Sequence, residues 1–164
     1  MIHRLAVASI ATAAALTFAA SAAAEDHDHH VGTLQGLRVV HAWTRATDGG
    51  TAYVFCDIEN SGARDAQLVG GDSAVGSDTA LVGFRLNSAG EGVYEILPSV
   101  PVKAGGKMAL MPEGAAIRLD GLGAPLKQGD EFEIELEFDT GHMEIHVSVE
   151  APNARAHSHA GHDH

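Results

Sequence analysis

The chain has 164 residues, enough for one domain with terminal extensions, and its 22 acidic and 10 basic side chains give a formal net charge of −12. This acidic balance excludes nucleic acid and anionic membrane surfaces as partners, because both are bound through basic patches. The eleven histidines are the unusual feature of the composition, and most of them lie in two clusters near the ends.

Residues 1–24 have the pattern of a secretory signal peptide. Arg4 precedes an Ala-rich apolar run, and small residues lead up to Ala24 as a cleavage site. The rest of the chain contains no apolar run long enough to span a bilayer. We therefore expect a mature protein that is exported to the periplasm and has no membrane span after cleavage.

Residues 25–35 are predicted to form a histidine-rich tail. If cleavage follows Ala24, then Glu25, Asp26 and His27 present a free amine, two amide nitrogens and an imidazole, a square-planar set that suits Cu(II) or Ni(II) better than zinc. Cleavage one residue earlier would destroy this arrangement. In either case His27, His29 and His30 form a flexible string that binds divalent metals loosely.

From residue 36 the sequence changes to short strand-like segments separated by turn residues. We expect strands at residues 37–43, 51–58, 65–70, 76–86, 92–96, 107–111, 116–119, 131–138 and 143–149. Residues 98–106 are expected to be an irregular crossing. Short strands at roughly ten-residue spacing, without helical periodicity, predict an all-β Greek-key β-sandwich over residues 36–150.

Residues 131–138 give the clearest strand signal. Phe132, Ile134, Leu136 and Phe138 alternate with four glutamates, which predicts one buried and one solvated face. The preceding loop, residues 121–130, carries turn residues and two leucines that we expect to reach back into the core.

No enzymatic motif is present. The glycines do not form a GxGxxG or GxxxxGK[ST] pattern, and there is no GxSxG. The one cysteine, Cys56, lies in an apolar strand and is predicted to be a small core residue. We therefore expect a protein that is not an enzyme.

Four further residues were considered as isolated metal ligands. His41 is expected to be an exposed or hydrogen-bonded strand residue, and Met111 an exposed residue at a turn, although its thioether is available. His142 and His146 flank Glu144 on the solvated face of the last strand, and about 13 Å separates strand residues four apart. They are expected to be surface histidines.

Residues 151–164 are predicted to form a second histidine-rich tail after the sandwich has ended. His157, His159, His162 and His164 form two His-x-His pairs joined by a short Ala-Gly spacer. Imidazoles at this density chelate Cu(II), Zn(II) or Ni(II), with copper favoured by the usual affinity order. If the two termini lie near one another, both tails could close on a single ion.

The folded part resembles a known family, the periplasmic copper chaperones called PCu(A)C. The resemblance covers about residues 36–149 and is most specific in the loop at residues 121–130. The other matching segments are residues 42–47, 52–54, 58–62, 92–94, 102–106 and 110–114. This resemblance implies a cupredoxin-like sandwich that carries copper to a recipient, such as an oxidase-assembly factor.

The resemblance also implies a family copper site of two histidines and two methionines. Aligned through the turns, those four positions are Arg85, Ile96, Arg118 and Asp120, so every ligand is replaced. Arginine stays protonated and isoleucine has no lone pair. We expect an ion-pair cluster in place of the metal, with an anion site as the alternative.

These observations predict a copper-binding protein or metallochaperone that captures Cu(II) through its histidine-rich termini and delivers or buffers it. The expected ligands are Glu25, His27, His29, His30, His157, His159, His162 and His164. One alternative is a zinc or nickel scavenger that uses the same tails. Another is a metal-free adaptor whose copper site has decayed.

Overall fold

The computed structural model describes residues 31–158. These residues form eleven β-strands and no helix, so none of them belongs to a helix that could cross a membrane. The strands are β1 (Gly32–Leu34), β2 (Leu37–Arg45), β3 (Thr51–Asn60), β4 (Ala66–Asp72), β5 (Asp78–Leu86), β6 (Gly92–Ile96), β7 (Val100–Val102), β8 (Lys107–Leu110), β9 (Ala115–Asp120), β10 (Glu131–Phe138) and β11 (Gly141–Glu150). The predicted all-β class is confirmed.

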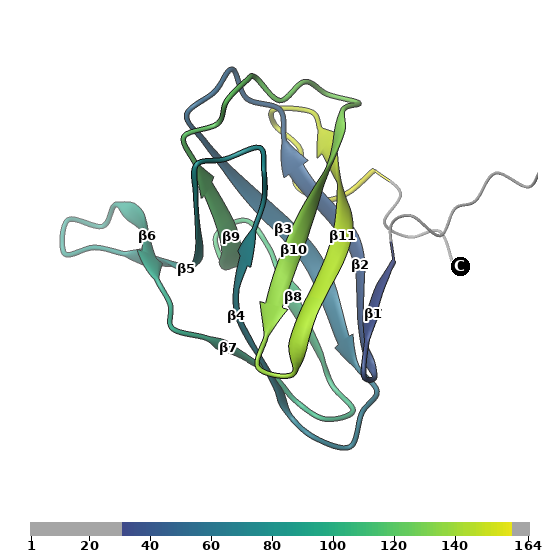
Figure 1. The fold of residues 1–164 in the computed structure, drawn as a ribbon. Helices are drawn as coiled ribbons and strands as arrows, with labels where there is room; N and C mark the ends of the chain where they lie inside the picture. Colours follow the sequence, from purple (N-terminus) through teal and green to yellow (C-terminus); the bar gives the residue numbers. More distant parts are fainter. Residues whose placement is uncertain (1–30, 159–164) are drawn as a thin grey trace, which may run out of the picture.

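The strands form one continuous sheet that bends over itself to enclose the core (Figure 1). Its order is β6-β5-β9-β3-β2-β11-β10-β4-β7, with β1 paired to β2 and β8 paired to β3. The strand β3 joins the two layers, because its first half pairs with β9 and its second half with β8. The described pairs are antiparallel apart from β2 with β11, and the whole is the expected Greek-key sandwich.

The core follows from the alternation that the sequence shows. Ile134, Leu136 and Phe138 of β10 are buried, Phe132 is partly buried, and the intervening glutamates face outward. Removing one such large apolar side chain from water contributes about 1.5–3 kcal/mol. Leu126 is buried and Leu122 packs against the core, as predicted for the loop before β10.

Two segments outside the predicted strands, one at Gly71 and one at residues 100–102, are part of the sheet. Gly70 and Gly71 continue β4, because a Cβ on Gly71 would lie 2.9 Å from the Glu135 carbonyl oxygen and only glycine fits so close to β10. Residues 100–102, expected to be irregular, form β7 at the edge of the sheet, where Pro101 is tolerated.

Both ends of the sandwich extend beyond the predicted boundaries. At the N-terminal side, residues 32–34 form β1, although the sequence places them in the tail. At the C-terminal side, the chain turns after β11, where the Ala154 N–H donates to the Ala151 carbonyl at 2.9 Å. Residues 151–158 then pack back onto the sheet instead of leaving it.

The returning segment covers the outer face of β2 and β3. Ala154 packs against a second apolar cluster centred on Trp43 and Phe55, and Arg45 Nε donates to the Ala154 carbonyl at 2.7 Å. Trp43 is therefore only 5% exposed, although it lies on the side of the sheet away from the main core. This segment, residues 151–158, is called the return segment below.

Candidate metal centre

Three of the four positions that the resemblance assigns to the family copper site form ion pairs. Arg118 Nε lies 2.7 Å from Asp120 Oδ2, and the other oxygen of Asp120 accepts a hydrogen bond from the Thr51 hydroxyl at 2.8 Å. The expected pair of Arg118 with Asp120 is confirmed. Ile96, at 71% exposure, contributes only an apolar surface here.

The expectation that Arg85 joins this pair is wrong. Arg85 forms an ion pair with Glu95 across the β5–β6 hairpin. Ala80 of β5 is the residue opposite Arg118, and five positions along a strand reverse the face from which a side chain projects. Arg85 and Arg118 therefore lie on opposite faces of the sheet.

Of the eight predicted tail ligands, the structure describes His157. The other seven, Glu25, His27, His29, His30, His159, His162 and His164, lie outside the described residues. His157 was expected in a flexible tail, whereas it is 7% exposed and lies in the return segment.

The side chain of His157 has a defined environment. Its Nε2 lies 3.7 Å from Glu150 Oε1, and that oxygen also accepts hydrogen bonds from the Ser158 N–H at 2.9 Å and the Ser158 hydroxyl at 2.8 Å. The ring stacks near that of His41, with centroids 6.0 Å apart and planes 29° apart. The fold therefore brings together two imidazoles that are far apart in the sequence.

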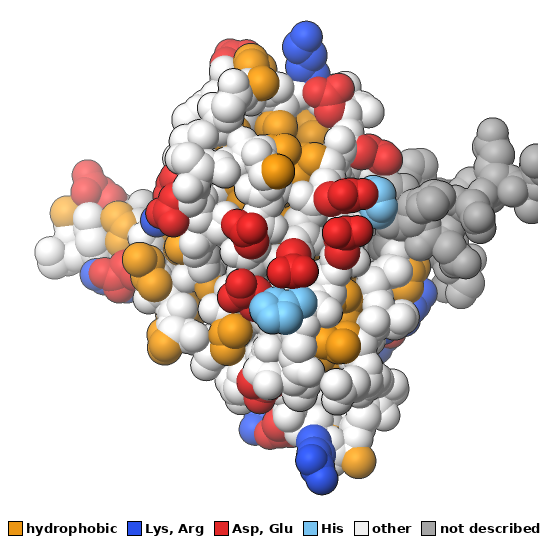
Figure 2. Space-filling view, in the orientation of Figure 1, with side chains coloured by type: hydrophobic (Ala, Val, Ile, Leu, Met, Phe, Trp, Pro, Cys, Tyr) orange, Lys and Arg blue, Asp and Glu red, His pale blue; other side chains and the backbone are white. Residues whose placement is uncertain are grey.

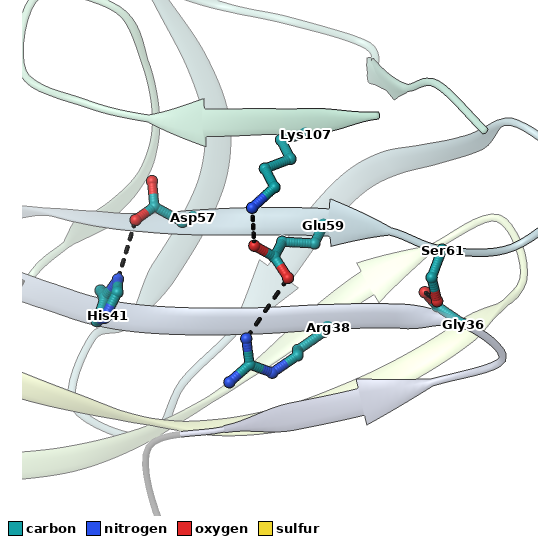
Figure 3. Close-up of polar contacts among 7 residues, drawn as sticks. All are labelled: Gly36, Arg38, His41, Asp57, Glu59, Ser61 and Lys107. Carbon is teal, nitrogen blue, oxygen red and sulfur yellow. Dashed lines mark hydrogen bonds and ion pairs between the residues drawn. The ribbon is translucent and has the colours of Figure 1, made fainter. Parts of the chain in front are cut away.

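His41 occupies an irregular position in β2. The register with β3 shifts between Val40 and Trp43, and His41 has a φ of +54°, which non-glycine residues rarely adopt. Its Nδ1 lies 3.1 Å from Asp57 Oδ2 on β3 (Figure 3). The expectation of a hydrogen-bonded strand residue is confirmed, but the bulge and the left-handed backbone were not foreseen.

His41 and His157 line one pocket of about 170 Å³ together with Asp57 and Met111. Met111 is 52% exposed, as expected for a residue at the turn after β8. Cys56 also borders the pocket, but it is 2% exposed and burial raises the pKa of its thiol. Since the thiolate is the ligating form, Cys56 remains the core residue that the sequence predicts.

Among residues 31–158, no three His, Cys, Asp or Glu side chains are grouped so that they could hold a metal ion. That criterion does not include methionine. The described body thus offers two imidazoles and a thioether at one pocket, which is a small set of ligands suited to copper rather than to a hard cation.

The two ends of the described chain both lie near His41. β1 pairs with β2 so that Gly32 is opposite Val39, which places Val31 beside Val40 and next to His41. The other end, Ser158, follows His157. Figure 1 shows the start of β1 and the end of the return segment on the same side of the molecule. Val31 and Ser158, the first and last described residues, therefore both lie near His41.

The histidines of β11 lie on a different face. Acidic side chains gather over β10 and β11 (Figure 2), and His142 Nδ1 lies 3.4 Å from Glu135 while His146 Nε2 lies 3.6 Å from Glu133. Each imidazole is beside a separate carboxylate, which confirms the expectation of surface histidines.

Comparison with known proteins now identifies the family. The family model described as "LpqE-like: Putative lipoprotein LpqE-like" matches residues 37–151, which is most of the chain and nearly all of the sandwich. The chain belongs to the LpqE-like family. A curated relative, "Putative lipoprotein Lxx21020" of Leifsonia xyli subsp. xyli (strain CTCB07), is 32% identical over 106 residues. That match covers 65% of this chain and 64% of the relative's own length.

Solved structures similar to this LpqE-like chain are PCuAC domains, which confirms the resemblance. The apo PCuAC domain from PmoF1 has a TM-score of 0.65 and 27% identity, over 75% of this chain and 100% of that one. The copper-bound PCuAC domain from PmoF2 has a TM-score of 0.62 and 21% identity, over 75% and 99%. Apo-DR1885 from Deinococcus radiodurans has a TM-score of 0.50 and 22% identity, over 92% and 97%.

Proposed function

We propose that this LpqE-like protein is an exported, non-enzymatic copper-binding protein that captures copper with its histidine-rich termini and then buffers or delivers it in the periplasm. The observation that supports the proposal is that β1 pairs with β2 while His157 lies beside His41 of β2, so the two ends of the described chain, Val31 and Ser158, both lie near His41. In this proposal, ligands from both segments bind one ion.

The sequence and the relatives support this proposal in different ways. The fold is that of PCuAC domains, one of which was solved with copper bound, and the curated relative is named a putative lipoprotein, which agrees with export. The ligands would come from residues 25–30 and 157–164, while residues 1–24 would be removed as a signal peptide. Neutral imidazoles favour Cu(II) over Zn(II) and Ni(II) in the usual affinity order.

The delivery step would use the sandwich as the carrier. The resemblance assigns Arg118 and Asp120 to the family copper site, and the two residues pair with each other; we infer that the metal is presented at the pocket of His41 and not on the sheet of β5 and β9. A recipient, such as an oxidase-assembly factor, would approach the side of the molecule on which both tails begin.

The test is a copper titration of the mature full-length chain by native mass spectrometry and calorimetry. In the comparison variant, six tail histidines (His27, His29, His30, His159, His162 and His164) are replaced by Ala. We expect the parental chain to bind Cu(II) and the variant to lose most of its affinity. Unchanged Cu(II) affinity in the variant would contradict the proposal, and stronger binding of Zn(II) or Ni(II) than of Cu(II) would support the scavenger alternative instead.

A further inference from the structure

We propose that the outer edge of β6 is a docking site for a second copy of this chain, so that two copies join through their β6 strands into one continuous antiparallel sheet. The association needs no metal and is separate from the proposed copper function. Three features of the β5–β6 hairpin support it: the open backbone edge of β6, the apolar side chains beside that edge, and the balance of charge.

The edge of β6 is open to another strand. β6 forms one end of the strand order, and no strand among residues 31–158 pairs with its outer edge. The strand at the opposite end, β7, contains Pro101, which cannot donate a hydrogen bond to a further strand. β6 itself has the sequence GVYEI, without proline or lysine, and its register with β5 has no bulge. It therefore lacks the usual devices that protect a sheet edge from pairing.

The backbone of β6 points alternately toward β5 and away from it. The Asn87 N–H donates to the Glu91 carbonyl at 2.8 Å, and the Leu97 N–H donates to the Leu81 carbonyl at 2.9 Å. Because hydrogen-bonded pairs alternate along an antiparallel ladder, the odd-numbered residues of β6 bond to β5. The N–H and carbonyl groups of the even-numbered residues are therefore directed outward, and these residues are Gly92, Tyr94 and Ile96.

These three residues select one register for the second copy. With Tyr94 of each copy on a twofold axis, Tyr94 is opposite Tyr94, and Gly92 is opposite Ile96 of the second copy. All the outward-directed groups then take part, which gives about six backbone hydrogen bonds across the contact. A shift by two residues would remove one of the three pairs. Such a contact uses the same patch on both copies and closes as a dimer.

Gly92 and Ile96 fit each other in this register. The ring of Phe84 occupies the space that a side chain on Gly92 would take, so this ring is the surface beside Gly92. Ile96 is 71% exposed, and Leu86, which is opposite Gly92 in the hairpin, is 64% exposed. These are the highest values among the exposed large hydrophobic residues of the described chain. In the dimer, Ile96 of the second copy lies over Phe84 and beside Leu86, and water is excluded from all three side chains.

Tyr94 holds the edge in place before any partner arrives. Its ring stacks on that of Tyr53 with centroids 4.5 Å apart and meets the ring of Phe84 edge-on at 5.4 Å. Its hydroxyl accepts a hydrogen bond from the Glu113 N–H at 3.2 Å. A strand that is already ordered loses little conformational entropy on pairing. Figure 1 shows the hairpin projecting from the sandwich, which leaves its outer edge accessible.

The charge of the hairpin favours a second copy as the occupant. Glu95, the one charged side chain of β6, pairs with Arg85 of β5, so the edge has no net charge of its own. The whole chain has a formal net charge of −12, which makes two copies repel each other in general. A basic partner would be attracted to the acidic face of β10 and β11 (Figure 2). The neutral, apolar edge of β6 instead fits a copy of itself.

Two substitutions at Ile96 test the contact without disturbing the hairpin. Ile96→Pro removes an N–H that does not bond to β5, a position at which a sheet edge tolerates proline. Ile96→Lys adds a charge to the edge, which opposes strand pairing. The matched control is Val69→Lys, because Val69 is a β-branched residue with 40% exposure on β4, a strand that already pairs on both sides.

The experiment is sedimentation velocity of the mature full-length chain and these variants at concentrations up to about 1 mM. A metal chelator is present, so metal bridges between histidine-rich tails cannot join two chains. We expect the parental chain and Val69→Lys to change from monomer to dimer as the concentration rises. Both Ile96 variants should weaken the dimer at least about tenfold.

A cysteine at the twofold axis tests the register. Tyr94→Cys places two thiols opposite each other with Cα atoms about 5.5 Å apart, within the range of a disulfide. Leu86→Cys is the control on the same face, because the two β5 strands of the dimer are about 14 Å apart. Cys56 is 2% exposed and does not compete. On mild oxidation, Tyr94→Cys should form a linked dimer much faster than Leu86→Cys.

Three results would overturn the proposal. A parental chain that stays monomeric at every concentration would leave the edge of β6 to a strand of a different protein. A dimer that both Ile96 variants leave unchanged would place the contact elsewhere on the molecule. Equal rates of cross-linking for the two cysteine variants would exclude the register centred on Tyr94. Copper binding by the tails affects none of these readouts, so the proposed function can fail or stand independently.

Discussion

Glu59 on β3 lies between two cations on the outer face of the sheet. Its carboxylate pairs with Lys107 Nζ and with Arg38 Nη1, the latter at 3.4 Å (Figure 3). The hydrogen bond from Lys107, followed by the attraction of Arg38, holds the pKa of Glu59 below its usual value. A carboxyl group with a lowered pKa stabilises the fold above its unfolded pKa of about 4.3, and this stabilisation is lost as the pH falls through the folded pKa.

Glu59→Gln should therefore destabilise the protein at pH 7 by about 0.5–1 kcal/mol, the usual range for a partly exposed ion pair. The difference from the parental chain should shrink as the pH falls below about 4. Urea unfolding at pH 7 and at pH 3 measures both quantities. Asp48→Asn, which removes a charge from an exposed turn, is the control and should have little effect. An equal difference at both pH values would contradict the assigned pKa direction.

Cys56 is predicted to be unreactive in the native state. It is 2% exposed and burial raises the pKa of its thiol, so little thiolate is available at neutral pH. A chromogenic disulfide reagent should label Cys56 only after unfolding in urea. Rapid labelling of the native protein would show that the pocket opens to the thiol, and it would contradict the closed packing of β3 against β8.

The sequence predicted the local environment of His41, Cys56 and Met111. It did not predict that these residues line one pocket. Val39, Val40, Ala42 and Trp43 are all apolar, so the broken alternation around His41 gave no clear face for its side chain. A β-bulge explains this broken alternation, because it adds one residue to β2 and so changes the face to which the following side chains point. The partners of His41 come from β3 and the return segment, which the local sequence does not reveal.

At the level of elements, a substitution at Gly71 tests whether β4 is one continuous strand that packs closely against β10. A methyl group on Gly71 would lie 2.9 Å from the backbone oxygen of Glu135. Gly71→Ala should therefore lower the free energy of unfolding by about 1–3 kcal/mol through overpacking. Gly123→Ala, where no atom lies within 4 Å, is the control and should be tolerated. Thermal unfolding distinguishes the two, and equal melting temperatures would contradict the close pairing of β4 with β10.

The return segment gives a second prediction at this level. Ala154 covers the Trp43 cluster, and Trp43 is the only tryptophan of the chain. Ala154→Arg should lift the segment, shift the Trp43 emission to longer wavelength and increase quenching by acrylamide. Ala156→Arg, at an exposed position of the same segment, should leave the emission unchanged. Identical spectra for both variants would mean that the return segment does not cover Trp43.

The strands themselves were largely predictable, for a physical reason. The strand β10 alternates without interruption, so its bounds and its buried face agree with the structure. The strand β7 was missed because a proline at a sheet edge has the same sequence signature as a loop. The return segment was missed because Pro152 and Asn153 form a turn, and a turn does not reveal whether the following chain leaves the body.

For the whole molecule, the fold class followed from the spacing of strands and turns, whereas the meeting of the two ends did not. That meeting requires β1 to pair with β2 and the return segment to pass over β2, and the second is a contact between residues remote in sequence. The acidic face over β10 and β11 lies elsewhere, with its histidines beside separate glutamates (Figure 2). Copper chemistry is therefore expected at the pocket of His41 and not on this face.

The most direct test of the account is the position of copper in a crystal of the full-length chain soaked with copper, located by anomalous scattering. We expect the ion at the pocket of His41 and His157, near which the two ends of the described chain lie. Copper on the β5–β9 sheet beside Arg118 and Asp120, or among the glutamates of β10, with the pocket empty, would contradict it.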